Sequence, residues 1–166
     1  MTQLQHAIED SVAMLRGLTG LEEPLNRATK MILTCLTSGH KLLVCGNGGS
    51  ASDATHLATE FLCRFLGDRR PYPAISLTAN GEFMTAVCND YSADEIFARQ
   101  VWGLGEKGDV LIAFTTSGKS RNILRARRHQ RPGQPDRFGI TTSETWLQLY
   151  RTLTGGIFVV SIGVAA

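Results

Sequence analysis

The chain has 166 residues, a formal net charge of +2 at pH 7 and 43% hydrophobic residues. This length suits one domain with its own core, and the nearly balanced charge excludes a protein that binds polyanions through its overall charge. No apolar run approaches membrane-spanning length and the N-terminus carries no leader-like pattern, so we expect a cytoplasmic protein without a membrane partner.

The cysteines lie inside apolar or helical runs and none has C-x-x-C spacing. Such cysteines are typical of reduced, mostly buried thiols in a cytosolic protein. They are Cys35, Cys45, Cys63 and Cys88.

Apolar periodicity predicts an alternation of helices and short apolar strands. In chain order we expect helices over 4–15 and 25–36, a strand over 41–45, a helix over 51–65, a strand over 73–77, helices over 82–88 and 93–104, and a strand over 109–114 with a helix after it. Short strands separated by helices favour a three-layer α/β/α fold, with a parallel sheet covered by helices on both faces.

The pattern changes near Arg125. The segment 119–137 holds seven of the seventeen Lys and Arg residues against one acid, and HQRPGQPDR contains two prolines that would stop a helix. Beyond these prolines we expect a strand over 137–141, a helix over 144–153 and a strand over 157–164.

Two glycine turns, GNGGS (46–50) and TTSGKS (115–120), follow strands of the predicted sheet, and ligands of parallel sheets bind at such strand ends. TTSGKS precedes a helix, an arrangement that favours phosphate binding, although a helix cap without a ligand is the alternative. Gly118-Lys119-Ser120 also matches the end of a nucleotide P-loop, but Ala113 stands where that motif has its first glycine. Binding of a nucleoside triphosphate is therefore not predicted.

Three acidic or imidazole side chains share one face of the helix after GNGGS, because Asp53, His56 and Glu60 are three and four residues apart. His56 and Glu60 can bind the same metal ion, with Asp53 as a supporting partner of the imidazole. The alternative is an ordinary surface hydrogen bond between them.

The arginines after TTSGKS could contact nucleic-acid phosphates, but no aromatic residues interleave with them and no nucleic-acid module is recognisable, so we do not expect nucleic acid as the main partner. They are Arg121, Arg125, Arg127, Arg128 and Arg131.

Residues 4–124 resemble the sugar isomerase (SIS) domain family, and within it the sedoheptulose-7-phosphate isomerases, also called phosphoheptose isomerases. The segments that carry the resemblance are CGNGGSASDATHLATEF, YPAISL, AVCNDYSADEIFARQV and GEKGDVLIAFTTSGKSRNIL. The resemblance implies one SIS domain over 1–166 with an atypical tail from 125, a five-stranded parallel sheet, and N-terminal helices that pack in a homotetramer. It also implies an isomerase that interconverts sedoheptulose 7-phosphate and D-glycero-D-manno-heptose 7-phosphate in the biosynthesis of heptose and lipopolysaccharide precursors.

The resemblance further implies roles for single residues. Glu60 matches the catalytic carboxylate, and together with His56 it matches two ligands of a zinc cofactor. The residues that match the substrate site are Asn47, Gly48, Gly49, Ser50, Glu60, Asn89, Asp90, Thr115, Thr116, Ser117 and Ser120. The family's other two zinc ligands, a glutamine and a histidine eight residues later, have no counterpart, because Gln134 is followed at that spacing by Thr142 and Gln148 by Gly156.

A shift of the reading frame near codon 125 is one hypothesis for this departure, since out-of-frame reading of a GC-rich gene yields Arg, Pro and Gly. The alternative to an isomerase is a non-catalytic SIS protein that binds a phosphosugar or a protein partner, for example a replication-initiation factor. His56 and Glu60 favour the enzyme, whereas the missing zinc ligands favour the binding protein.

Overall fold

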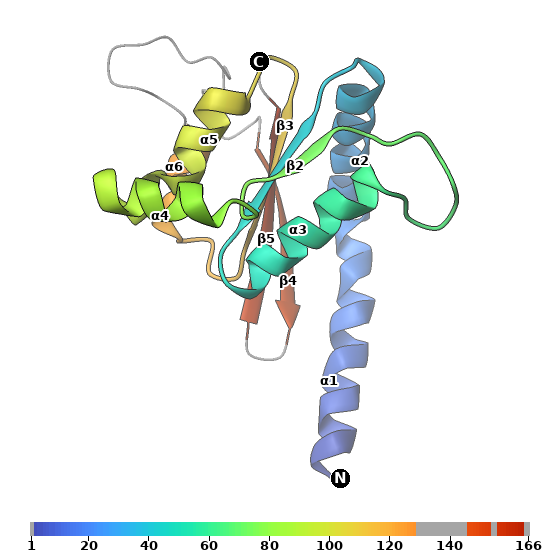
Figure 1. The fold of residues 1–166 in the computed structure, drawn as a ribbon. Coiled ribbons are helices and arrows are strands. Elements are labelled where there is room, and N and C mark those ends of the chain that lie inside the picture. The colour runs from blue at the N-terminus through green and yellow to red at the C-terminus, as the bar shows by residue number, and fades with distance from the viewer. Residues whose placement is uncertain (1, 129–145, 154–155, 165–166) are drawn as a thin grey trace.

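The structure is a computed structural model that describes residues 2–128, 146–153 and 156–164 (Figure 1). Its α-helices (α) and strands (β) follow the predicted order as far as residue 128, with ends that differ by three residues at most when the 3₁₀ helix η2 is counted with α5. The 3₁₀ helix η1 was not predicted. In chain order they are α1 (Gln3–Gly17), η1 (Leu18–Leu21), α2 (Glu22–Thr37), β1 (Leu42–Gly46), α3 (Gly49–Leu62), β2 (Ala74–Ser76), α4 (Gly81–Asp90), η2 (Ala93–Glu95), α5 (Ile96–Leu104), β3 (Val110–Thr115), α6 (Arg121–Arg128), β4 (Trp146–Leu153) and β5 (Gly156–Val164).

Five strands form one sheet in the order β2-β1-β3-β5-β4. Strands β2 and β3 both pair with β1 in parallel, so that Leu43 faces Ile75 on one side and Leu111 on the other. The predicted parallel sheet with flanking helices is confirmed for these three strands. The connections between them run through helices, as parallel neighbours require.

The C-terminal hairpin differs from the predictions. The prediction of a helix over 144–153 is wrong, because residues 146–153 form β4, which pairs antiparallel with β5. Only two residues separate these strands, and so short a connection allows only an antiparallel pair. Because β5 is also antiparallel to β3, the sheet is not parallel throughout. The predicted strand over 157–164 is confirmed as β5, while the one over 137–141 lies outside the described residues.

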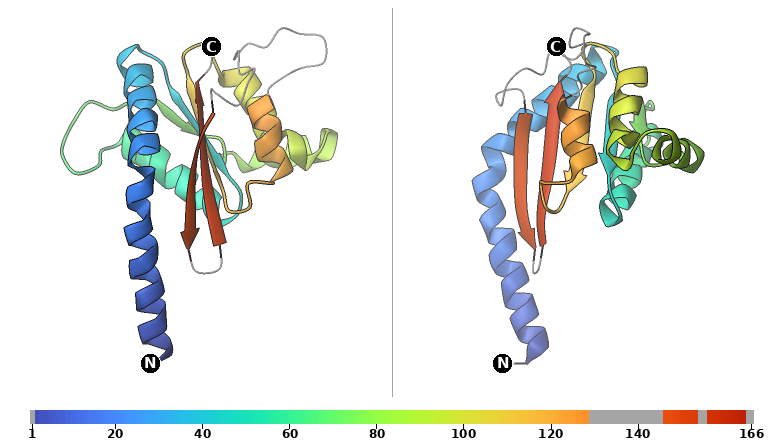
Figure 2. Two further views of the ribbon diagram at one scale, coloured as in Figure 1. Left: turned by 180° about the vertical axis from the view of Figure 1, so that it is seen from behind. Right: turned by 90° about the vertical axis from the view of Figure 1, so that its left-hand side faces the viewer.

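Helices cover the sheet on both faces, with α4, α5 and α6 on one side and α2 and α3 on the other (Figures 1 and 2). Alternate residues of β1 point to opposite sides, since Leu43 and Cys45 pack with the first group of helices, and Leu42 and Val44 with the second. Burial on both faces explains why β1 and β3 are nearly continuous apolar runs.

Helix α1 extends past the edge of the sheet (Figure 1). It leaves apolar side chains exposed to solvent. Leu4 is 70% exposed, Ile8 53% and Leu15 54%. The helix begins at a capping box, in which the Thr2 hydroxyl accepts from the backbone N–H of Gln5 and the Gln5 side chain accepts from that of Thr2. Within the part of the chain that the structure describes, no helix is long and apolar enough to cross a membrane.

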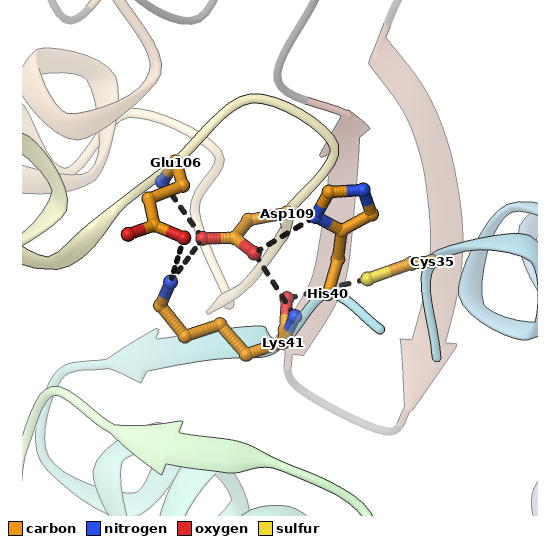
Figure 3. Close-up of polar contacts among 5 residues, drawn as sticks. All are labelled: Cys35, His40, Lys41, Glu106 and Asp109. Atoms are coloured by element: carbon orange, nitrogen blue, oxygen red, sulfur yellow. Dashed lines mark hydrogen bonds and ion pairs between the residues drawn. The ribbon is translucent and has the colours of Figure 1, made fainter. Parts of the chain in front are cut away.

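A buried carboxylate joins the amino ends of β1 and β3 (Figure 3). One oxygen of Asp109 accepts from the backbone N–H of Lys41 at 2.9 Å, and the other accepts from the backbone N–H of Glu106 at 2.8 Å and from Nζ of Lys41 at 2.7 Å. His40 Nδ1 lies 4.0 Å from the same carboxylate. Burial works to lower the pKa of Lys41, but the hydrogen bond and charge of Asp109, helped by Glu106, outweigh it and raise that pKa.

All four cysteines are free; Cys35 and Cys45 are buried, whereas Cys63 and Cys88 are exposed. Burial, and then the charge of Asp109, raise the pKa of the Cys35 thiol to about 11. Burial alone raises the pKa of Cys45 well above its ordinary value of 9.0.

We expect Asp109→Asn to lower the free energy of unfolding by about 2–4 kcal/mol, because one amide oxygen cannot replace two carboxylate oxygens and the Lys41 ammonium loses its buried counter-ion. Urea unfolding followed by circular dichroism measures the loss. The exposed Asp68→Asn is the matched control, and an equal effect of both substitutions would contradict the structural role of Asp109.

We expect the free energy of unfolding to fall as the pH rises above about 9. The folded pKa of Cys45 is higher than its unfolded value, so the folded state holds the proton longer and stability is lost once the unfolded thiol ionises. This loss reaches about 1.4 kcal/mol at pH 10. Urea unfolding in reducing buffer from pH 7.5 to 10 gives the slope, which Cys45→Ala lowers and the exposed Cys63→Ala does not. An unchanged slope in Cys45→Ala would count against this assignment.

Candidate functional site

The two predicted turns meet at the carboxyl edge of the sheet, because β1 and β3 are parallel neighbours in which Gly46 pairs with Phe114. A cavity of about 320 Å³ lies between the turns. This volume lies within the range of cavities that bind small molecules in proteins. The residues that line the cavity are Asn47, Gly49, Ser50, Asp53, Phe114, Thr115, Thr116 and Ser120.

The first turn folds tightly back on itself before α3 begins. The backbone N–H of Ser50 donates to the carbonyl of Asn47 at 3.0 Å, and Gly48 has φ of +57°, a conformation that favours glycine. A Cβ at Gly46 would overlap the carbonyl group of Ser50. The glycines therefore let the chain turn at once into α3, whose first N–H groups lie at the edge of the cavity.

The second turn is held together by its own hydroxyl groups. Thr115 Oγ1 accepts from the backbone N–H of Gly118 at 3.2 Å and lies 3.3 Å from the hydroxyl of Ser120. Ser117 Oγ accepts from the backbone N–H of Lys119 at 3.1 Å. Helix α6 starts directly after this turn, so two helix N-termini and several hydroxyls approach the same cavity, a combination suited to an anion such as phosphate.

A pair of amides joins the first turn to the start of α6, the helix that follows the second turn, across 75 positions of sequence. Asn47 Nδ2 donates to Asn122 Oδ1 at 2.9 Å, and Asn122 Nδ2 donates to Asn47 Oδ1 at 2.7 Å. Sequence reasoning missed Asn122. A signal was available in the sequence. Asn122 lies in the first turn of the helix after TTSGKS, and Asn47 follows the strand that is expected to lie beside the strand before TTSGKS.

His56 and Glu60 contact each other on α3 outside the residues that line the cavity. His56 Nε2 and Glu60 Oε1 are 3.0 Å apart, with side chains 76% and 30% exposed. Asp53, expected to support His56, lines the cavity instead.

The end of α3 that carries Glu60 is held by an arginine from the following loop. Arg69 donates to the backbone carbonyls of Glu60 and Phe61, the latter at 2.9 Å, and its guanidinium lies 4.9 Å from the ring centre of Tyr72. The backbone N–H of Tyr72 also donates to the carbonyl of Phe61 at 3.0 Å. These contacts satisfy carbonyls that a helix leaves free at its C-terminus and hold the loop against the last turn of α3.

The residues predicted for zinc do not complete a zinc site by themselves. Zinc takes three or four protein ligands, and His56 and Glu60 provide two. Across residues 2–128 and the two described C-terminal strands, no group of three or more His, Cys, Asp or Glu side chains is placed to hold a metal ion.

The structure thus gathers only part of the predicted site at the cavity. The predicted residues that line it are Asn47, Gly49, Ser50, Thr115, Thr116 and Ser120. Gly48 and Ser117 belong to the same two turns without lining it. Asn89 and Asp90 lie apart at the end of α4, where the Asn89 amide donates to the Asp90 carboxylate at 2.8 Å.

Comparisons with known proteins agree with this geometry. The phosphoheptose isomerase of Shewanella sediminis is 50% identical over 106 residues, which cover 64% of this chain and 54% of that protein. That of Nitratidesulfovibrio vulgaris is 46% identical over 123 residues, or 74% of this chain and 59% of the relative. The chain thus spans somewhat more than half the length of these curated relatives.

Solved structures give the same family. Phosphoheptose isomerase GmhA from Neisseria gonorrhoeae superposes with a TM-score of 0.69 at 38% identity, covering 76% of this chain and 65% of that one. A phosphoheptose isomerase from Francisella tularensis has the same TM-score and identity, covering 78% of this chain and 70% of that one. Residues 8–134 match the family model of the SIS domain, and the chain therefore belongs to the SIS-domain family.

Proposed function

We propose that this protein is a cytoplasmic aldose–ketose isomerase that interconverts sedoheptulose 7-phosphate and D-glycero-D-manno-heptose 7-phosphate, for heptose and lipopolysaccharide precursors. The observation that carries the proposal is the cavity between two glycine turns at the start of α3, the helix on which Glu60 stands. The relatives are phosphoheptose isomerases, which supports a phosphorylated heptose as the substrate.

The substrate phosphate binds among the hydroxyls of Thr115, Thr116 and Ser120, where the N-termini of α3 and α6 favour negative charge. Asp53 lines the same cavity and repels an anion, but its carboxylate accepts hydrogen bonds from sugar hydroxyls. These opposite preferences orient the substrate, with the phosphate toward the Thr and Ser side and the sugar toward Asp53.

The position of Glu60 on α3 suits a long sugar phosphate. Glu60 follows Gly49 by eleven residues, which is about 16 Å along the helix axis. Helical side chains lean back toward the N-terminus and shorten this distance. An extended seven-carbon sugar phosphate measures roughly 10 Å, from single bonds of about 1.5 Å. A phosphate held between the turns therefore lets the other end of the substrate extend toward Glu60.

Glu60 transfers the proton between carbons 1 and 2. Its carboxylate removes a proton from C1 of the ketose while O2 takes up a proton from water, which gives the 1,2-enediol. The same group then returns the proton to C2 while the hydroxyl on C1 loses its proton to water, so that the carbonyl forms at C1. His56, 3.0 Å from Glu60 Oε1, holds the carboxylate in place. The resemblance implies zinc, which would be bound by His56 and Glu60 with further ligands from outside the described residues or from a second chain. The proton transfers by Glu60 do not require it.

The exposed apolar stripe of α1 supports a homotetramer in which the N-terminal helices of several copies pack together. Leu4, Ile8, Val12 and Leu15 lie at helical spacing and are 40–70% exposed. A helix of 15 residues has marginal stability by itself in water, so a partner that covers this stripe also stabilises α1.

We expect the purified chain to convert sedoheptulose 7-phosphate to the aldose and Glu60→Gln to lower kcat at least 100-fold, because the amide cannot accept the proton. Glu22→Gln, an exposed carboxylate on α2, is the control and keeps its activity. The assay is a discontinuous measurement of the aldose, accompanied by metal analysis of the same samples.

Binding of sedoheptulose 7-phosphate without conversion would instead support a non-catalytic phosphosugar-binding protein, the function that the incomplete zinc site favours. Absence of both binding and conversion would overturn the proposed function.

We expect light scattering to give a mass near four times the 18.1 kDa of one chain, and Leu4→Ser/Ile8→Ser to lower it, because the variant removes two of the most exposed apolar side chains of α1. The control His6→Ser/Glu9→Ser changes exposed polar positions of the same helix and keeps the mass. A monomeric wild-type chain would refute this assembly.

A further inference from the structure

Asn122 does not line the cavity, but it bonds to Asn47, which does. The pair links the GNGGS turn to α6 with bonds of 2.9 and 2.7 Å. Asn122 is itself anchored at the start of α6, where its Oδ1 also accepts from the backbone N–H of Ile123 at 3.0 Å.

Two reciprocal hydrogen bonds fix the orientation of an amide group, whereas a single bond would let the group rotate about it. Each asparagine side chain has two N–H donors and an oxygen with two lone pairs. The pair uses one donor and one lone pair of Asn47, sets the plane of its amide, and leaves one N–H and one lone pair for a ligand in the cavity. Without Asn122, the exposed Asn47 side chain would have to give up its rotational freedom when a ligand binds.

We propose that Asn122 is a positioning residue: it orients the Asn47 amide and joins the GNGGS turn to the start of α6, so that the cavity is ready to bind a phosphorylated sugar. The free N–H of Asn47 then donates to a substrate oxygen without reorganisation. This proposal rests on the proposed function, and it assigns Asn122 an effect on the substrate that passes through Asn47 alone.

A double-mutant cycle on the full chain tests that route. Calorimetric titration with sedoheptulose 7-phosphate gives the affinity of the wild type, Asn122→Ala, Asn47→Ala and the double variant. We expect Asn122→Ala to weaken binding roughly five- to tenfold in the wild-type background and less than twofold in the Asn47→Ala background. Asn26→Ala, an exposed asparagine on α2, is the matched control with unchanged affinity.

Equal losses in both backgrounds would overturn the proposal, because Asn122 would then act independently of Asn47. If Asn122→Ala fails to fold, Asn122→Ser replaces it in the cycle, since serine keeps a polar group at the first turn of α6 but cannot form both bonds of the amide pair.

Hydrogen exchange of the ligand-free protein separates this proposal from the proposed function. We expect Asn122→Ala to speed exchange of the backbone amides of Ser50 and Ala51, whose bonds close the first turn, and Asn26→Ala to leave them unchanged. If Asn122→Ala speeds this exchange but the wild type does not bind the sugar phosphate, Asn122 stabilises the first turn and has no role in substrate binding. Unchanged exchange together with an additive cycle would overturn both parts of the inference.

Discussion

The parallel pairing of β1 with β3 is the constraint on which the rest of the molecule depends. These two strands run side by side from Leu42 opposite Val110 to Gly46 opposite Phe114, with helices on both faces. Because parallel strands end at the same edge, the two turns that follow them must lie together, although they are about seventy residues apart in sequence. The cavity, its hydroxyl groups and the starts of two helices are consequences of this pairing.

The two edges of the sheet use polar side chains in opposite ways. At the amino edge Asp109 is fully buried, and its oxygens accept from backbone N–H groups and from Lys41 (Figure 3). A carboxylate whose partners are all internal has little capacity left for a ligand, so it stabilises the fold. At the carboxyl edge the hydroxyl groups line an open cavity and keep donors for a ligand. The two edges therefore differ mainly in how deeply their polar side chains are buried and in whether those side chains already have partners within the protein.

The periphery of the domain is where this chain departs from a fully parallel α/β architecture. Strand β5 pairs antiparallel with β3, and β4 with β5, so the sheet continues as a hairpin on the side away from β2 (Figure 2). Helix α1 in turn leaves an apolar stripe uncovered within one chain. The three parallel strands and their helices thus hold the cavity, while the uncovered apolar stripe of α1 lies outside this core.

Local spacing was enough to predict the helices and strands up to residue 128, the two glycine turns, and the contact between His56 and Glu60, because each depends on residues close together in the chain. It was not enough for β4, where a sequence with helical spacing pairs with β5, since strand pairing is decided by which partner lies beside a segment. The place of Asp53 in the cavity and the bond between Asn47 and Asn122 also depended on the tertiary structure. The sequence by itself determined the α-helices and strands up to residue 128 and the chemistry of each turn. Only the tertiary structure decided the pairing of β4 and which side chains meet, because strand order brings together residues that no local pattern connects.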